Sequence, residues 1–192
     1  MTKQVPLGVD RRDAIADAAI HLVATRGLRG LTHRAVDAEA GLPPGSTSYY
    51  LRTRNALLTA CVNRMLARDM SAVPPTTAGA EPLELLIEMV VSLARDRPDD
   101  LIARYELSLE ASRQPELRAA IDEGGRQLRA LLAHVLNGLG IRDAEEAAWP
   151  TAAMMDGLLY DRVAGAGATL SAEAFESAVR RSITALLAGL RN

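Results

Sequence analysis

The chain has 192 residues, of which 48% are hydrophobic but only 3% aromatic, and its formal net charge is −2. This length can bury one sizeable core or two small ones. The single cysteine, Cys61, excludes an internal disulfide bond and any multi-cysteine metal site, which fits a reducing compartment. No apolar run approaches the roughly 20 residues of a membrane-spanning helix, and the N-terminus lacks the apolar core of a signal peptide. We therefore expect a soluble, cytoplasmic protein with no membrane partner.

Charge is unevenly distributed along the chain. Residues 1–60 hold eight basic and five acidic residues, a net charge of +3, so the remainder carries −5. A basic N-terminal part on an acidic body is typical of a protein whose DNA contact is confined to one end.

Alanine-rich amphipathic stretches with few aromatic or β-branched runs predict an all-α fold. The first helix is expected from Asp10, its capping residue, to Gly27, which ends it. A second short helix follows with Thr32 as N-cap, and Gly41 ends it because glycine takes the left-handed conformation at least cost. Leu42 is the apolar residue of the turn after Gly41, and we expect it to pack between the helices.

A third helix is predicted directly after this turn. Pro43-Pro44 cannot continue a helix but can open one. Small residues, hydroxyls, tyrosines and arginines follow, which is the composition that a helix lying in a DNA major groove requires. The pattern predicts a helix-turn-helix. Its candidate DNA-binding residues are Thr32, Arg34, Gly45, Ser46, Thr47, Ser48, Tyr49, Tyr50, Arg52 and Arg54.

This stretch resembles the N-terminal signature of the tetracycline-repressor (TetR) family, T-x-R-x-V/I-A-x-x-A-G-V followed by G-S/T-x-Y-x-Y-F-x-S-K-E-x-L. The matching residues are Thr32, Arg34, Val36, Ala40, Gly41, Gly45, Ser46, Tyr50 and Leu57. The departures from the signature include Ser48 for tyrosine, Leu51 for phenylalanine, Arg54 for lysine and Asn55 for glutamate. The resemblance implies a homodimer that reads a palindromic operator on double-stranded DNA. It also implies that Arg54 keeps a phosphate contact and that Tyr49 substitutes for the missing tyrosine.

Further helices are predicted along the rest of the chain. One runs from Arg54 to about Met70, and Cys61 on its apolar stripe is expected in the core rather than as a redox sensor. Later helices start at Pro82, Pro98, Pro115, Asp143 and Ser171. Two interruptions are expected. Gly124-Gly125 marks a kink, a close helix contact or a tolerated surface position, and Pro150 predicts a bend near Trp149. In the helix after Pro98, the residues expected to face inside are Leu101, Ile102, Tyr105 and Leu109, with Leu107 as a further candidate.

The segment 71–82, rich in Pro, Ala, Thr and Gly, predicts a boundary between a DNA-binding head, residues 1–70, and a ligand-binding and dimerisation body, residues 71–192. The helix from Arg54 is then expected to be the one covalent route between them, with Met65 and Leu66 at its inward end. Candidate ligand-binding residues are Met89, Tyr105, Leu109, His134, Trp149, Met154, Met155 and Tyr160. The predicted dimer interface is formed by Trp149, Met155, Leu159, Val163, Phe175, Val179, Ile183 and Leu186.

The sequence offers no constellation typical of catalysis. The three histidines lie on separate predicted helices without carboxylates at ligand spacing, and no serine occupies a nucleophile elbow. We expect no enzyme activity, no metal and no cofactor. The favoured interpretation is a ligand-responsive DNA-binding transcriptional regulator, a repressor released from its operator by an unknown small-molecule effector. The alternatives are a helical sensor or interaction protein that acts without sequence-specific DNA binding, and a small all-α enzyme.

Overall fold

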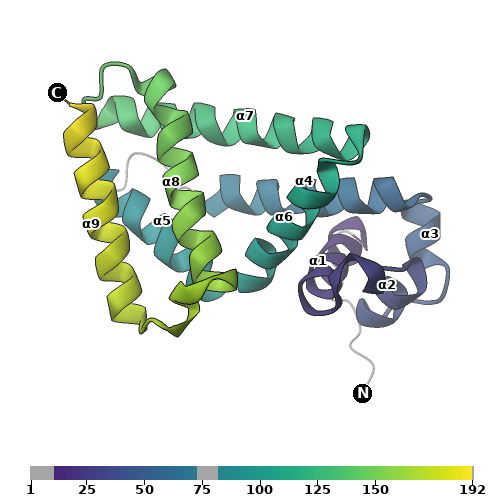
Figure 1. Ribbon diagram of the computed structural model, residues 1–192. Coiled ribbons are helices and arrows are strands. Elements are labelled where there is room, and N and C mark those ends of the chain that lie inside the picture. The colour runs from purple at the N-terminus through teal and green to yellow at the C-terminus, as the bar shows by residue number, and fades with distance from the viewer. Residues whose placement is uncertain (1–10, 73–81, 192) are drawn as a thin grey trace. The chain divides into compact units, whose positions relative to one another are not determined.

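The computed structural model describes residues 11–72 and 82–191, which form nine α-helices, one short 3-10 helix and no strand (Figure 1). The predicted all-α fold is confirmed. Residues 1–10, including the predicted capping residue Asp10, and most of the predicted boundary segment 71–82 lie outside the described residues. The helices are α1 (Arg11–Gly30), α2 (His33–Glu39), α3 (Ser46–Tyr50), α4 (Arg54–Ala72), α5 (Pro82–Asp96), α6 (Pro98–Ala111), α7 (Pro115–Gly138), α8 (Ala144–Ala164), η1 (Ala166–Thr169) and α9 (Ala172–Leu190).

Helix starts follow the predicted capping residues and prolines. α5, α6 and α7 each begin at a proline, whose missing N–H costs nothing in a first turn. The Thr32 and Ser171 hydroxyls cap α2 and α9, each accepting a hydrogen bond from the backbone N–H three residues on. Asp143 lies at the N-cap of α8, but its side chain makes no capping hydrogen bond.

Glycines have two different effects inside the helices. Gly27 has φ 66° and ψ 175°, so regular α-helix ends there as predicted, although a last turn extends to Gly30. At Gly124-Gly125, in contrast, α7 is not interrupted. Gly124 is buried, and a Cβ placed on it would lie 3.5 Å from a methyl of Leu66, which favours the expected close helix contact over a kink. α8 likewise continues through Pro150.

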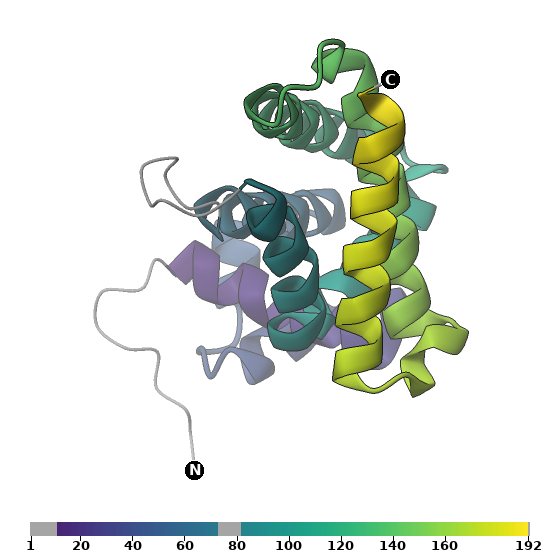
Figure 2. The ribbon, with the colours of Figure 1, turned by 90° about the vertical axis from the view of Figure 1, so that its left-hand side faces the viewer.

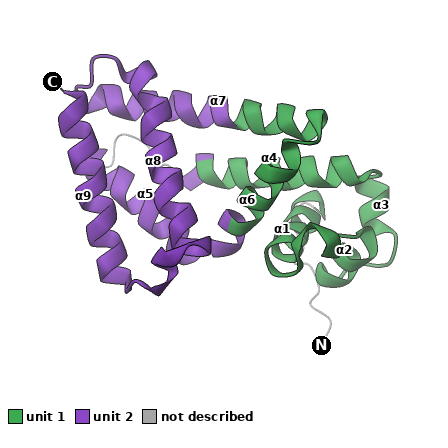
Figure 3. Cartoon of the chain, viewed as in Figure 1, with its two compact units in different colours: residues 1–69, 102–124 green, residues 70–101, 125–192 purple. Residues whose placement is uncertain are grey.

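The chain folds into two compact units (Figure 3). Unit 1 comprises residues 1–69 and 102–124, and unit 2 comprises 70–101 and 125–192. The chain first passes from unit 1 to unit 2 after residue 69. Residues 102–124 belong to unit 1, because Ala103, Leu107, Ala111 and Leu117 share one hydrophobic core with α1 and α4. Three helices, α4, α6 and α7, therefore have residues in both units, which corrects the expectation of a single covalent route.

One predicted core position on α6 is wrong. Leu109 is 67% exposed, whereas Leu107 is completely buried. The reason is helical spacing: Ala103, Leu107 and Ala111 recur every four residues and share one face, and Leu109 lies two residues from Leu107 on the opposite face.

In unit 2, α5, α8 and α9 pack against one another, and α8 and α9 lie side by side in both views (Figures 1 and 2). Their packing corrects the residues predicted for the dimer interface. Five of the eight are buried within the single chain, because they form the core between these helices. They are Met155, Leu159, Phe175, Val179 and Ile183. Val163 and Leu186 are half-buried, and Trp149 is 67% exposed.

Cys61 is fully buried in the core of unit 1, and burial raises the pKa of its thiol from 9.0 to about 12. Because the thiolate is the reactive form, we predict that a maleimide or disulfide reagent leaves the folded protein unmodified at pH 8 and modifies one thiol per chain in denaturant. Cys61 is the single cysteine of the chain, so the number of labelled thiols reports on it alone. Rapid labelling of the folded protein would show that this thiol is accessible and would restore the redox-sensor interpretation.

Candidate nucleic-acid interface

The turn between α2 and α3 is a helix stop built on Gly41. Gly41 has φ 65°, and the N–H of Leu42 donates to the carbonyl of Asp37 at 2.8 Å. This is the backbone pattern of a Schellman motif. Leu42 is partly buried against the core of unit 1, as predicted for the apolar residue of the turn. The turn therefore fixes the direction in which the chain leaves α2.

A buried carboxylate connects α2 to the start of α3. Asp37 is only 4% exposed. Its Oδ1 accepts hydrogen bonds from the backbone N–H and the hydroxyl of Thr47, at 2.7 and 2.6 Å, and its Oδ2 accepts one from the Gly45 N–H at 2.7 Å. Gly45, the N-cap residue of α3, has no side chain with which to cap the helix. Asp37 supplies the missing acceptors from the neighbouring helix and holds α3 in place.

Two further contacts anchor the ends of this motif. The His33 ring hydrogen-bonds through Nε2 to the carbonyl of Leu51, directly after α3, at 2.7 Å. The guanidinium of Arg54 donates from its two terminal nitrogens to the carbonyls of Leu28 and Leu31, each at 2.6 Å. The first bond holds the end of α3 to the start of α2, and the other two hold the start of α4 against the backbone that precedes α2.

The structure divides the predicted DNA-binding residues into three groups. Thr47 is fully buried and its hydroxyl is donated to Asp37, so its predicted contact with DNA is wrong. Arg54 is on the surface, but its guanidinium is turned to backbone carbonyls, which makes it a positioning residue. The third group lies on the surface around α2 and α3: Thr32, Arg34, Gly45, Ser48, Tyr49 and Arg52 are exposed, and Ser46 and Tyr50 are half-buried.

Asp37 and His33 have structural roles that the sequence analysis did not predict. One signal for Asp37 was present in the sequence. A helix opened by Gly45 has unpaired N–H groups in its first turn and no side chain of its own to accept from them. Two carboxylates on α2, Asp37 and Glu39, precede the turn at Gly41, and the structure uses Asp37 as the acceptor.

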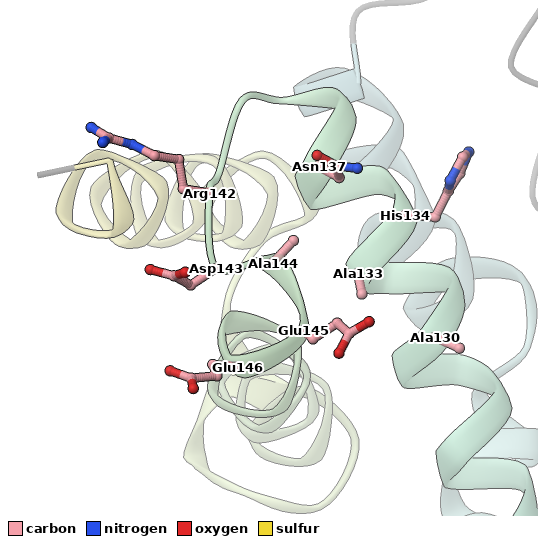
Figure 4. Close-up of a pocket in the computed structure, with 9 residues that line it drawn as sticks. All are labelled: Ala130, Ala133, His134, Asn137, Arg142, Asp143, Ala144, Glu145 and Glu146. Atoms are coloured by element: carbon pink, nitrogen blue, oxygen red, sulfur yellow. The ribbon is translucent and has the colours of Figure 1, made fainter.

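Unit 2 contains a cavity of about 570 Å³ where the end of α7 meets the start of α8 (Figure 4). Glu145 points from the first turn of α8 towards Ala133 on α7, whereas Arg142 and His134 point away from each other. Of the eight predicted ligand-binding residues, His134 alone lines this cavity. Tyr105 and Leu109 belong to unit 1 and the other six to unit 2. Trp149 and Tyr160 are 67% and 50% exposed, Met155 is buried, and Met89 and Met154 are half-buried.

An all-helical chain that presents a rigid helix-turn-helix with exposed hydroxyl, phenol and guanidinium groups belongs to the class of helix-turn-helix DNA-binding proteins. Comparison with known proteins specifies the family. Residues 77–189 match the model described as "Tetracyclin repressor-like, C-terminal domain". The HTH-type transcriptional regulator BetI of Rhizobium meliloti (strain 1021) is 33% identical over 170 residues, which cover 85% of this chain and 83% of BetI.

Solved structures agree with this assignment. A transcriptional regulator from Rhodococcus sp. Rha1 has the same fold, with a TM-score of 0.80 at 23% identity, covering 94% of this chain and 97% of that one. The multidrug binding protein EbrR has been solved with imidazole, ethidium and proflavin. In its imidazole complex it is 31% identical with a TM-score of 0.66, covering 93% of this chain and 95% of EbrR. The chain belongs to the TetR family and is a DNA-binding transcriptional regulator.

No helix within residues 11–72 and 82–191 is long and apolar enough to cross a membrane.

The role of Asp37 predicts the effect of one isosteric change. Asp37→Asn places an NH₂ group where a carboxylate oxygen now accepts, so at least one buried donor faces another donor. We expect the free energy of unfolding to fall by roughly 2–3 kcal/mol, measured by urea titration, together with weaker DNA binding. Glu39→Gln makes the same chemical change on an exposed side chain of α2 and should alter neither. Equal stability of Asp37→Asn and the parent protein would contradict the role given to this carboxylate.

Proposed function

We propose that this chain is a homodimeric repressor that binds a palindromic operator through its helix-turn-helix and leaves it when a small molecule binds the body. The observation that carries the proposal is the fixed position of α3 beside exposed Arg34, Ser48, Tyr49 and Arg52. Hydroxyl and phenol groups suit contacts with phosphates and base edges, and guanidinium groups neutralise phosphate charge. Residues 1–70 then act as the DNA-binding head, and residues 71–192 as the ligand-binding and dimerisation body.

Dimerisation is part of the proposal because one five-residue helix contacts too few base pairs to select an operator. The exposed side of α8 offers a suitable surface. Five residues share an arc of about 80° at helical spacing and face away from the core of unit 2. They are Trp149, Ala153, Gly157, Tyr160 and Ala164. Small residues between two exposed aromatic rings allow two copies of α8 to approach closely, so we place the interface on this stripe rather than on the buried residues of α9.

The effector is proposed to be a small organic molecule held by unit 2. A cavity of about 570 Å³ lies in the size range of ligand pockets, and EbrR, which is similar over most of its length, is a multidrug binding protein. Imidazole, ethidium and proflavin are therefore suitable first probes of operator release. Control also requires that the effector favour the conformation with weaker DNA affinity. The coupling can pass through α4, α6 or α7, because each has residues in both units.

The phosphate role of Arg52 is tested by salt dependence. Arg52→Ala should weaken binding to an operator and to random DNA by similar factors, and it should lower the slope of log affinity against log salt by about one phosphate contact. Fluorescence anisotropy with labelled genomic fragments measures both. Arg181→Ala removes an exposed guanidinium from unit 2, away from the cavity, and should change neither quantity. If Arg52→Ala binds both DNAs as the parent protein does, the proposed docking is wrong, and if the parent binds no DNA, the helical-sensor alternative holds.

The dimer surface predicts a specific effect at Gly157. A Cβ at this position meets nothing within 4 Å in the single chain, so Gly157→Arg should fold normally but place a charge in the centre of the stripe. We expect sedimentation at micromolar concentration to show a dimer for the parent protein and a 20.5 kDa monomer for the variant. Gly138→Arg, at an equally open glycine of α7, should remain dimeric. A monomeric parent protein, or a dimeric Gly157→Arg, would rule out this interface.

A further inference from the structure

The base-reading capacity of α3 is restricted, because two of its five side-chain hydroxyls form hydrogen bonds within the protein and a third belongs to the half-buried Tyr50. Thr47 is buried and hydrogen-bonded to Asp37. The Ser46 hydroxyl donates to the Pro43 carbonyl at 2.6 Å. Tyr50 is half-buried and packs against the core of unit 1. Of the five residues of α3, Ser48 and Tyr49 are the two whose side chains are exposed.

No residue of α3 carries a guanidinium or a carboxamide group. Those groups make the bidentate hydrogen bonds by which proteins commonly select guanine or adenine in the major groove. The exposed surface of α3 instead offers one short hydroxyl and one large aromatic ring. An apolar side chain in the major groove discriminates mainly by contact with the C5-methyl group of thymine.

The ring of Tyr49 is both exposed and held in place. Its residue is 76% exposed, the largest value among the large hydrophobic residues of the described chain. The ring packs edge-on against that of Tyr50, with centroids 5.1 Å apart and an interplanar angle of 86°. Tyr50 is itself anchored in the core. A ring fixed in this way loses little conformational freedom when a partner covers it, so its apolar surface is available for binding.

We infer that Tyr49 is the specificity-determining residue of α3 and that its ring recognises the C5-methyl group of a thymine in each operator half-site. The inference rests on the proposed operator binding and specifies how that site reads sequence. Alternatively, the Tyr49 hydroxyl donates a hydrogen bond to a phosphate. The experiment below separates this role from recognition of the methyl group.

The test removes single methyl groups from the DNA. An operator is first selected from random DNA with the full-length protein. Each thymine of one half-site is then replaced by deoxyuridine, which lacks the C5-methyl group and keeps every Watson–Crick hydrogen bond. Burying one methyl group changes an affinity by about fourfold. We expect one thymine at which deoxyuridine weakens binding about fourfold, and about fifteenfold when both half-sites are substituted.

Protein variants assign this loss to the ring. Tyr49→Ala should bind the parent operator more weakly and be indifferent to deoxyuridine at that thymine. Tyr49→Phe keeps the ring without the hydroxyl and should retain the fourfold penalty, as should Ser48→Ala. Tyr49→Phe and Ser48→Ala should melt at the parent temperature, and Tyr49→Ala, which loses the ring contact with Tyr50, should melt slightly below it. Circular dichroism checks that all three variants are folded.

Two results would overturn the inference. In the first, Tyr49→Ala shows the same deoxyuridine penalties as the parent protein at every thymine. In the second, Tyr49→Phe loses affinity as Tyr49→Ala does while no thymine is sensitive to methyl removal, which assigns Tyr49 to a phosphate. Both leave operator binding intact. Failure to select any DNA at all would instead contradict the proposed function.

Discussion

The position of α3 depends on one buried carboxylate. A helix of five residues is far below the length at which helices are stable alone, and its N-cap residue is a glycine. Asp37 compensates by accepting one hydrogen bond from Gly45 and two from Thr47 at the start of α3. A buried carboxylate is costly unless its oxygens are hydrogen-bonded, so the arrangement is stable only when α3 lies in this one position. The hydrogen bonds of the buried Asp37 therefore determine which residues of α3 face the DNA.

The same requirement explains why two residues with typical DNA-contacting groups form hydrogen bonds within the protein instead. The Thr47 hydroxyl donates a hydrogen bond to Asp37. The Arg54 guanidinium donates hydrogen bonds to the carbonyls of Leu28 and Leu31. Holding a short helix consumes polar groups, and only those remaining are available to DNA. What remains is mainly Tyr49, Ser48 and the neighbouring arginines, which gives the motif strong phosphate attraction but a narrow choice of base contacts.

Much of the fold could be predicted from local signals, and the candidate site only in part. Prolines and capping hydroxyls act within one turn of the chain, so Pro82, Pro98, Pro115, Thr32 and Ser171 indicated helix starts correctly. Side-chain direction within the motif depends on tertiary contacts, which a pattern of residue types does not contain. Asp37 stands where the TetR signature has alanine, yet its significance emerges only when Thr47 is seen beside it. The buried residues of α9 were assigned to an interface for the same reason: an apolar helix face can pack on a partner chain or on α5, and the sequence favours neither.

Native-state hydrogen exchange at Gly45 tests the central role of Asp37 most directly. Gly45 is an exposed residue in a turn before a short helix, and such an amide ordinarily exchanges at nearly the rate of an unstructured chain. If its N–H donates to the buried carboxylate, it should exchange as slowly as the buried Thr47 amide, and both should lose protection together in Asp37→Asn. Fast exchange at Gly45 in the parent protein would show that α3 is not held by this carboxylate.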